Sequence, residues 1–356
     1  MSTKVLIVDD SAYTRQLMKK IIEQDSSLVV VGIAADGIDA MAKTLRLKPD
    51  IITLDFEMPE MDGFSFLRWL MRERPTPVIM VSSHHDSKTV FKALELGAVD
   101  FIAKPTKRAS LELQSIEKDL LRKIRGIKEI RLDILSKNLE LLDLEREEAF
   151  EPAGESGQES VQVVAVGSST GGPAALQIIL TRLPADFPAG IIVSQHMPRG
   201  FTGPLSERLN KLAQIRIKEA ADNDPVEPGT VLICPGGYHL GLRRKGARTA
   251  VTLKEGSLTD KYVPSVDHMM KSAAEMFGAN AMGVLLTGMG NDGAHGMVEI
   301  KGQGGYTIAE SEESAVVFGM PAEAIKAGAV ESVLPISDIP AEIIRVVSYS
   351  VNREKR

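Results

Sequence analysis

The sequence predicts two α/β domains, each built on a doubly wound, mostly parallel sheet, with a β-hairpin added to the second domain. The chain has 356 residues, of which 44% are hydrophobic, and this is more than one core usually holds. In both halves continuously apolar runs alternate with helical periodicity, and such runs belong to parallel sheets covered by helices on both faces. The stretch EPAGESGQES, at 151–160, has linker composition and separates the halves.

The first half contains five apolar runs: KVLIVD, VVVGIA, DIITLD, PVIMVSS and VDFIAK. Each run is followed by a helical pattern, such as TRQLMKKIIEQ after the first, so the runs form five βα units. We expect this domain to occupy residues 1–126. In sheets of this kind, ligands bind at the carboxyl ends of the strands.

Residues 111–149 lack proline and show long helical periodicity. The segment is either the last helix of the first domain prolonged into a connector or a seam between chains of an oligomer. Ordinary helix lengths favour the connector. We therefore expect a helical connector and linker over 127–160.

The second half repeats the alternation of apolar runs and helical patterns. The runs VQVVAVG, AGIIVSQ and AMGVLLTG are each followed by helical periodicity. The segment HLGLRRKGARTAVTLK predicts an antiparallel hairpin that turns at Lys245-Gly246. We expect the second domain to occupy residues 161–356.

Composition and charge exclude several classes of function. The net charge of −6 provides no positive field for nucleic acid phosphates or an anionic membrane surface, and the basic cluster at 243–245 lies at the hairpin turn. Cys234 is the only cysteine, so no internal disulfide forms, as is typical of a reducing compartment, and we expect Cys234 in the core or a turn. No uncharged apolar stretch approaches the roughly 18 residues of a membrane span. We expect a soluble, cytoplasmic protein that neither binds nucleic acid nor inserts into a membrane.

The strand ends of the first half carry chemically useful groups. Asp9 and Asp10 end the first run, Asp55 the third, Ser82 the fourth and Lys104 the fifth. Carboxylates gathered at one edge repel one another unless a divalent cation neutralises them, and an all-oxygen site suits Mg²⁺. Asp55 is then the expected nucleophile toward a phosphoryl donor, with Lys104 neutralising the phosphate and the Ser82 hydroxyl bonding to it. A single Asp here would be read as a solvated cap, but five coordinated positions favour chemistry.

These residues, with TLDFEMPEMDG at 53–63, resemble the response-regulator receiver family over about a third of the chain. The resemblance implies a flavodoxin-like fold and phosphorylation of Asp55 by a histidine kinase. It also implies that Asp10, Asp55 and the Glu57 carbonyl bind Mg²⁺.

The same resemblance implies a conformational switch in this domain. Phe101 is the switch aromatic, which swings when Ser82 turns toward the phosphate. The Lys104-Pro105 bond is expected to be cis.

Three strand ends in the second half carry the groups of an acyl-transfer site. Ser169 is the centre of a G-x-S-x-G turn after the first run, His196 follows the second, and Asp292 follows the third. If the strands are parallel, the three groups share one edge of the sheet. A weakly acidic hydroxyl needs an imidazole to accept its proton and a carboxylate to orient that imidazole.

Each member has a plainer interpretation. Ser168 and Thr170 are chemically similar neighbours of Ser169, and Asp292 could cap the helix that starts near Ala294. His196 competes with the other histidines, and His295 is the serious rival. The competing histidines are His84, His85, His239, His268 and His295.

The turn G-S-S-T-G-G also raises the possibility of a phosphate-binding loop. It matches neither dinucleotide nor P-loop patterns and has no lysine for a β- or γ-phosphate. Thr170, Gly171 and Gly172 instead precede Pro173, which suits the first turn of a helix, so backbone N–H groups there would face negative charge. That arrangement is half of an oxyanion hole.

The segments GSSTGGPAAL, QHMPRGFT, LTGMGNDGAHGM and VVFGMPAEAIKAG together resemble the chemotaxis receptor methylesterase family, of the CheB type. The resemblance, with the receiver, covers nearly the whole chain. It places the triad on Ser169, His196 and Asp292, and assigns the oxyanion hole partly to the backbone at Met289. It implies hydrolysis of glutamate γ-methyl esters on membrane chemoreceptors, with deamidation of glutamines also expected.

The resemblance also sets what we expect of regulation and partners. Methylated cytoplasmic helices of chemoreceptors are the expected substrate, a chemotaxis histidine kinase is the phosphodonor, and the esterase step needs no cofactor. The receiver is expected to block the edge that bears Ser169 until Asp55 is phosphorylated. The alternative is a receiver-regulated binding module without hydrolase activity.

Overall fold

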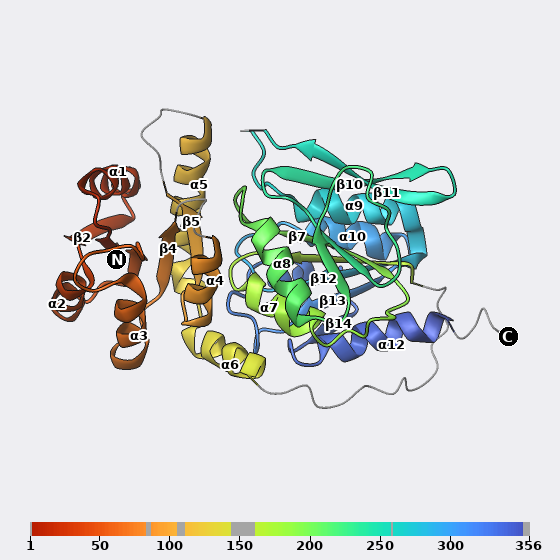
Figure 1. Cartoon of the computed structure of the whole chain (residues 1–356). Coiled ribbons are helices and arrows are strands. Elements are labelled where there is room, and N and C mark those ends of the chain that lie inside the picture. The colour runs from red at the N-terminus through yellow and green to blue at the C-terminus, as the bar shows by residue number, and fades with distance from the viewer. Residues whose placement is uncertain (1, 83–86, 105–110, 144–160, 258, 352–356) are drawn as a thin grey trace. The chain divides into compact units, whose positions relative to one another are not determined.

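The chain forms two compact units in a computed structural model that describes residues 2–82, 87–104, 111–143, 161–257 and 259–351 (Figure 1). The N-terminal unit is Met1–Ser136 and the C-terminal unit is Lys137–Arg356. Each unit has its own sheet and its own core.

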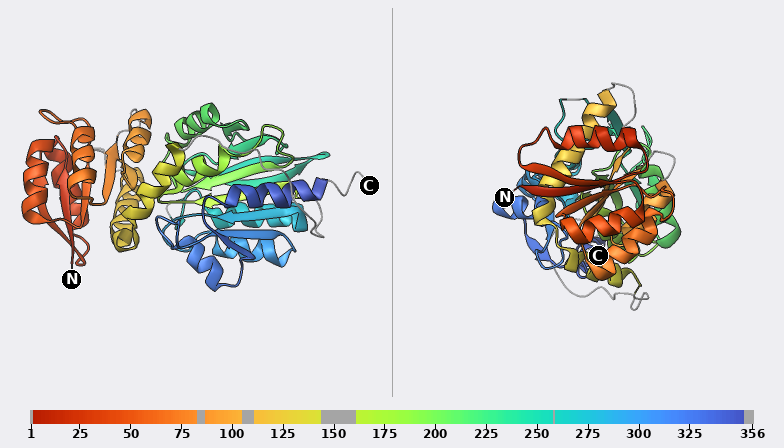
Figure 2. Two further views of the ribbon diagram at one scale, coloured as in Figure 1. Left: turned by 90° about the horizontal axis from the view of Figure 1, so that it is seen from below. Right: turned by 90° about the vertical axis from the view of Figure 1, so that its left-hand side faces the viewer.

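The N-terminal unit is a five-stranded parallel sheet with the strand order β2-β1-β3-β4-β5. Its strands are β1 (Thr3–Val8), β2 (Leu28–Ala34), β3 (Ile51–Leu54), β4 (Val78–Ser82) and β5 (Asp100–Ala103). Its helices are α1 (Ala12–Ile22), α2 (Gly37–Leu47), α3 (Gly63–Glu73), α4 (Ser87–Glu95) and α5 (Leu111–Arg125). Helices lie on both faces of the sheet, as Figure 2 shows on the right, with α1 against α5 and α2 against α3. The predicted doubly wound fold is confirmed.

Side-chain caps fix where three of these helices begin. Ser11 caps α1, Asp36 caps α2 and Asp62 caps α3, and each accepts a hydrogen bond from the backbone N–H three residues further on. The helices therefore start close to the carboxyl ends of the strands. The turns that carry the site residues are held at that edge.

The expected long helix after residue 111 is interrupted. The helix α5 is followed by the 3-10 turn η2 (Gly126–Glu129) and then by α6 (Leu132–Asp143). Glycine disfavours a helix interior, and Ile130 has extended backbone with φ −78° and ψ 128°, so the helical pattern does not continue as one rod. The expected linker at 151–160 lies outside the described residues.

The C-terminal unit is a seven-stranded parallel sheet with the order β14-β13-β12-β6-β7-β9-β8, accompanied by a separate hairpin. Its sheet strands are β6 (Val163–Ser168), β7 (Gly190–Gln195), β8 (Arg216–Glu219), β9 (Thr230–Ile233), β12 (Ala281–Leu285), β13 (Tyr306–Glu310) and β14 (Ser332–Leu334). The predicted hairpin is confirmed as β10 (Tyr238–Lys245) and β11 (Arg248–Glu255), with Lys245 paired to Arg248 across the turn.

Two helical layers enclose this sheet, as the left view of Figure 2 shows with green helices on one side and the lighter blue helices on the other. The helices are α7 (Gly172–Leu180), α8 (Thr202–Leu212), α9 (Val266–Phe277), α10 (Ala294–Gly302), α11 (Met320–Lys326) and α12 (Ile339–Val351), with the 3-10 turn η3 at Gly278–Asn280. The helix α10 contacts α9 and α11, α7 contacts α8 and α12, and the hairpin strand β10 packs on α9.

The buried core of the C-terminal unit holds Cys234, with Val163, Ile192 and Met269 among its other members. Burial raises the pKa of the Cys234 thiol, so this group is a structural side chain rather than a nucleophile. Among the residues that the structure describes, none of the helices has the length and apolar character that a bilayer crossing requires.

Candidate active site

The three predicted catalytic groups lie at one edge of the C-terminal sheet. Strand β6 pairs in parallel with β7 on one side and with β12 on the other, and Ser168 is in register with Gln195. Parallel neighbours bring their carboxyl ends to the same edge, so the turns that follow them meet there. Ser169, His196 and Asp292 follow these three strands, and all three side chains are buried.

His196 and Asp292 form a close buried pair. The His196 Nε2 atom lies 2.7 Å from Asp292 Oδ2, and these side chains are 3% and 2% exposed. The other ring nitrogen, Nδ1, is buried and has no hydrogen-bond partner among the described residues. With Nε2–H donating to the carboxylate, Nδ1 carries the lone pair that can accept a proton.

The Asp292 carboxylate sits at the beginning of α9. Its Oδ1 accepts hydrogen bonds from the Ser265 hydroxyl and the Asp267 N–H, both at 3.0 Å, and its Oδ2 accepts one from the Val266 N–H at 2.7 Å. Burial raises the pKa of Asp292, but the His196 hydrogen bond and the two backbone donors outweigh it and hold the pKa below its ordinary value. The carboxylate is therefore ionised and fixed in place.

Asp292 does not cap the helix that follows it, so the plainer interpretation of this residue is wrong. The Asp267 Oδ1 atom accepts hydrogen bonds from Gly293 N–H at 2.9 Å and Gly296 N–H at 2.7 Å, at the start of α10. The N-cap residue Gly293 makes no side-chain cap bond. Two adjacent helices thus exchange caps: Asp267 of α9 caps α10, and Asp292 caps α9.

Ser169 and Ser168 have different surroundings. The Ser168 hydroxyl donates to Gln195 Oε1 at 2.6 Å and is fully buried. The Gln195 amide donates to the carbonyls of Ser169 at 2.9 Å and His196 at 3.1 Å, which ties the two turns together. Within the described part of the chain, the Ser169 hydroxyl makes no hydrogen bond, to His196 or to any other group. Ser169 is the hydroxyl left available for chemistry.

The turn from Gly288 brings a second backbone segment against Ser169. A Cβ atom at Gly288 would lie 2.7 Å from Ser169 Cβ, so only glycine allows this approach. Among the described residues, the N–H of Met289 donates no hydrogen bond. On the other side, Gly171 adopts φ +80° and α7 starts at Gly172, next to Thr170.

None of the rival histidines that the structure describes forms a hydrogen bond with Ser169 or Asp292. His239 contacts Asp260 at 3.0 Å through Nε2 and accepts from Ser265 N–H through Nδ1, and its ring lies 5.4 Å from that of His268. His295 is exposed on α10. The remaining pair at positions 84 and 85 lies outside the described residues.

Several residues that sequence reasoning missed complete this site. Gln195 clamps the two turns, Asp267 caps α10, and the Tyr262 ring stacks on the His196 ring. The buried Glu310 carboxylate accepts from Thr287 N–H at 2.8 Å, and burial raises its pKa to about 7. The sequence could have indicated Gln195, because it directly precedes His196 at a strand end. The other residues reach the site only through tertiary packing, so the sequence does not indicate them.

At the edge of the N-terminal sheet, three carboxyl groups gather. Oxygen atoms of Asp9, Asp10 and Asp55 all lie within 4.8 Å of one another, and Lys104 Nζ lies 2.6 Å from Asp55 Oδ2 and 3.2 Å from Asp9 Oδ2. Burial and the charge of Asp55 raise the pKa of Asp9 to about 6. Burial also raises the pKa of Asp55, although Lys104 opposes it.

This acidic cluster has the donor chemistry that Mg²⁺ requires. The Asp9 Oδ2 atom is buried and, among the described residues, accepts no hydrogen bond despite the nearby ammonium. A hard cation with oxygen ligands would satisfy it. Asp9 was predicted as one of the paired acids but not as a ligand, and the geometry adds it to Asp10 and Asp55.

The turn after Asp55 is held tightly. A Cβ at Gly63 would lie 2.4 Å from the Asp55 carbonyl oxygen, and the Gly63 N–H donates to the Phe56 carbonyl at 3.0 Å. Ser82 and Phe101, the predicted switch residues, are both buried. The Lys104-Pro105 bond lies outside the described residues.

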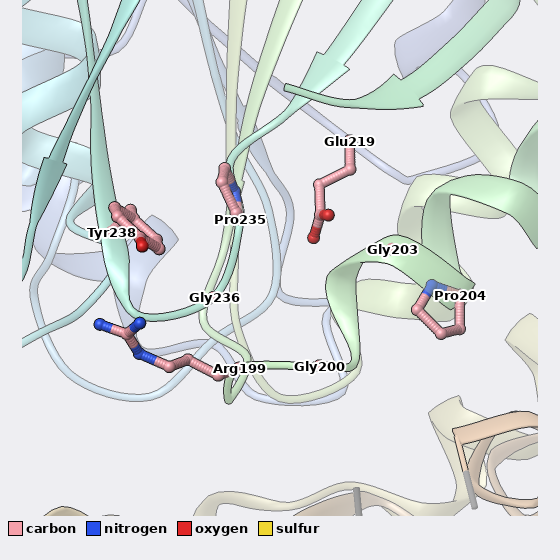
Figure 3. Close-up of a pocket in the computed structure, with 8 residues that line it drawn as sticks. All are labelled: Arg199, Gly200, Gly203, Pro204, Glu219, Pro235, Gly236 and Tyr238. Carbon is pink, nitrogen blue, oxygen red and sulfur yellow. The ribbon is translucent and has the colours of Figure 1, made fainter. Parts of the chain in front are cut away.

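A cavity of about 290 Å³ opens beside the loop that follows His196 (Figure 3). The Arg199 guanidinium lies 4.8 Å from the centre of the Tyr238 ring and donates to Glu255 at 2.5 Å. Glu219 accepts from the Thr202 hydroxyl at 2.5 Å. None of the three predicted catalytic residues lines this cavity, and its charged residues Arg199 and Glu219 are bonded to other side chains.

Comparison with known proteins identifies the family of each half of the chain. Residues 164–343 match the family described as CheB methylesterase, and residues 5–115 match the response regulator receiver domain. A protein-glutamate methylesterase/protein-glutamine glutaminase 3 from Geobacter sulfurreducens is 46% identical over 96% of both chains. A protein-glutamate methylesterase/protein-glutamine glutaminase 2 from Syntrophus aciditrophicus is 46% identical over 97% of this chain and 99% of its own. The crystal structure of the Thermotoga maritima CheB methylesterase catalytic domain has 43% identity and a TM-score of 0.51, covering 53% of this chain and 100% of that one.

Proposed function

The chain belongs to the CheB methylesterase family and carries a response regulator receiver domain, and from this premise we propose that it hydrolyses glutamate γ-methyl esters of chemoreceptors through Ser169, His196 and Asp292. The relatives named above are protein-glutamate methylesterases and protein-glutamine glutaminases. The substrate is therefore a methylated glutamate side chain on a cytoplasmic receptor helix. Glutamine deamidation is proposed as a second reaction of the same site.

In the proposed reaction, Ser169 Oγ attacks the γ-carbonyl carbon while His196 Nδ1 takes the hydroxyl proton. Asp292, ionised and bound to Nε2–H, stabilises the imidazolium that forms. The C–O bond to the methoxy group then breaks, and the imidazolium gives its proton to the departing methoxy oxygen, which leaves as methanol. Water activated by His196 hydrolyses the acyl-enzyme, which releases the glutamate carboxylate and restores the serine.

The backbone N–H groups of Thr170 and Met289 are the proposed oxyanion donors. Donors aimed at the developing charge are worth roughly 3 to 4 kcal/mol each in comparable sites. An amide follows the same route if His196 protonates the leaving ammonia. Ester and glutamine hydrolysis therefore need one site and no cofactor.

In the receiver, Asp55 is the proposed phosphoryl acceptor, with a chemotaxis histidine kinase as the donor. Asp9, Asp10 and Asp55 would hold Mg²⁺, with the Glu57 carbonyl as a further ligand, and the ion would neutralise the gathered carboxylates. Lys104 binds the phosphoryl oxygens, and Ser82 and Phe101 are the proposed switch residues.

The proposed domain division is a receiver over 1–126, a connector and linker over 127–160 and a catalytic domain over 161–356.

The single observation that carries the hydrolase proposal is the buried His196–Asp292 pair at 2.7 Å, at the sheet edge where Ser169 follows β6. A binding module without hydrolase activity would not require an imidazole whose second nitrogen is buried without a partner. This arrangement supports catalysis over simple binding.

The direct test replaces Ser169 by Ala and measures methanol release from methylated receptor. We expect release to fall by at least about a thousandfold, since the nucleophile is gone. Ser168→Ala is the matched control, because its hydroxyl is engaged by Gln195, and it should retain most of the activity. Undiminished release by Ser169→Ala would end the assignment.

A further inference from the structure

An aromatic ring lies flat against the imidazole of the proposed triad. The ring centroids of Tyr262 and His196 are 4.9 Å apart, and the two planes differ by 8°. Tyr262 comes from the loop between the hairpin and α9, far in sequence from the other groups of the site. It is half-buried, whereas His196 is buried.

The turn that carries Asp292 holds this tyrosine in place. The Tyr262 hydroxyl lies 3.4 Å from Asn291 Oδ1, and the neighbouring Lys261 Nζ donates to the same oxygen at 2.8 Å. A Cβ at Gly290 would lie 2.3 Å from the Tyr262 hydroxyl oxygen, so the tyrosine rests against the backbone of that turn. Tyr262 therefore touches His196 and the turn that carries its carboxylate partner.

A single hydrogen bond does not fix the orientation of a ring. The bond from His196 Nε2 to Asp292 sets one distance but leaves the imidazole free to rock about the line that joins the two atoms. The Nδ1 atom, which has no partner among the described residues, supplies no second anchor. The Tyr262 ring, stacked with its centroid 4.9 Å from that of His196, restricts this rotation of the imidazole. A tilted imidazole would either clash with the tyrosine ring or lose contact with it.

We propose that Tyr262 is a positioning residue for the reaction: its ring holds the plane of His196 so that Nδ1 faces the Ser169 hydroxyl. This inference rests on the proposed function, since it assigns Tyr262 a role through His196. The aromatic ring orients the imidazole, and the tyrosine hydroxyl serves only to hold that ring in place.

The test compares Tyr262→Phe, which keeps the ring, with Tyr262→Leu, which removes it, in the full-length chain. Two quantities are measured: kcat and KM for methyl ester hydrolysis on methylated receptor, and the rate at which a small fluorophosphonate labels the serine. The probe needs an activated serine but no receptor contacts, so it separates positioning from substrate binding. Tyr13→Leu, which changes an exposed tyrosine of the N-terminal unit, is the control for losing one ring.

We expect Tyr262→Leu to lower kcat about ten- to a hundredfold with KM changed less than about twofold, and to slow labelling by the same factor. Tyr262→Phe should stay within about threefold of the wild type in both. Wild-type labelling of the Leu variant would overturn the proposal, as would a Phe variant as impaired as the Leu variant. If the Leu variant loses its folded thermal transition, Tyr262→Met, which keeps side-chain length without a flat ring, replaces it.

Ser169→Ala distinguishes a failure of the proposed hydrolase function from a failure of the proposed role of Tyr262. If it abolishes labelling while the Tyr262 variants label normally, the hydrolase stands and only the role of Tyr262 fails. If Ser169→Ala labels at the wild-type rate, the proposed function fails whatever the Tyr262 variants do.

Discussion

Asp292 and Glu310 are both buried carboxyl groups of the catalytic unit, but their surroundings act in opposite directions. Asp292 has an imidazole and three other donors, and its pKa lies below the ordinary value. Glu310 has only the Thr287 N–H and the Ser314 hydroxyl, and burial outweighs them to raise its pKa from 4.5 to about 7. Near neutral pH the first is fully charged and the second is half protonated.

Glu310 should make the stability of this unit depend on pH. Between pH 4.5 and about 7 the folded state keeps a proton that the unfolded state has released, so stability falls as the pH rises through this window. Glu310→Gln does not titrate. Relative to the wild type, its free energy of unfolding should therefore gain on the order of 1 to 3 kcal/mol between pH 5 and pH 8. Urea unfolding of both proteins at the two pH values measures the difference between their free energies of unfolding. The same difference at pH 5 and pH 8 would contradict the prediction.

The acidic cluster of the receiver should bind Mg²⁺ with a measurable gain in stability. An ion that binds only the folded state at about 100 times its dissociation constant stabilises it by about 2.7 kcal/mol. The gain should shrink at pH 5, because Asp9, with a pKa of about 6, is then mostly protonated and competes with the metal. Thermal unfolding in Mg²⁺ and in EDTA at both pH values tests this. Asp10→Ala, which removes an exposed member of the cluster, should abolish the gain, and an equal gain in this variant would refute the site.

At the scale of elements, the catalytic unit depends on two helices that exchange caps. Asp267→Ala removes two hydrogen bonds accepted at the start of α10, and we expect it to lower the free energy of unfolding by about 1 to 2 kcal/mol. Its N–H still reaches Asp292, so kcat should fall far less than the roughly hundred- to ten-thousandfold expected for Asp292→Asn. Urea unfolding measures the stability of the two variants, and methanol release measures their activity. If both variants lose the same amount of activity, the expectation that Asp267 contributes mainly to stability and Asp292 mainly to catalysis is wrong.

The sequence predicts elements well where apolar character is continuous. Strands β6, β7 and β12 and the receiver strands β3, β4 and β5 are buried along their whole length, so their runs are unbroken. The receiver strands β1 and β2 have exposed positions at Lys4 and Val29 but keep apolar runs. Strand β8, with the sequence RIKE, and the short β14 lie at the sheet edges and have exposed positions, so no run marks them. The interruption after α5 was missed because one glycine hardly disturbs a periodic pattern.

The site follows the same division. Ser169, His196 and Asp292 could be found because each follows a predictable strand, and parallel strands end at one edge. The exchange of caps and the Tyr262 stack could not be found, because they join loops and helix ends whose proximity depends on how α9 packs against α10. Residues at the ends of predictable strands can be found in the sequence, whereas the residues that hold them in place are found only from the packing.

At the scale of the whole molecule, the receiver and the catalytic domain must communicate if phosphorylation controls hydrolysis. A phosphoryl group on Asp55 can shift a closed-to-open equilibrium only by its preference for the open form, and a tenfold change in activity needs about 1.4 kcal/mol. We expect a small phosphodonor to raise methanol release by the full chain about tenfold. Asp55→Asn should abolish that response without lowering the basal rate.

If the unphosphorylated receiver restrains the catalytic domain, removing it should release the activity without any phosphodonor. A fragment that starts near residue 160 keeps the whole seven-stranded sheet, all three proposed catalytic groups and the residues 164–343 that match the CheB methylesterase family. We expect this fragment to release methanol at least as fast as the phosphorylated full chain, and to ignore the phosphodonor. Circular dichroism establishes that the fragment is folded, and Ser169→Ala in the fragment supplies the background rate. A folded fragment no faster than the unphosphorylated chain would mean that the receiver does not restrain the catalytic domain.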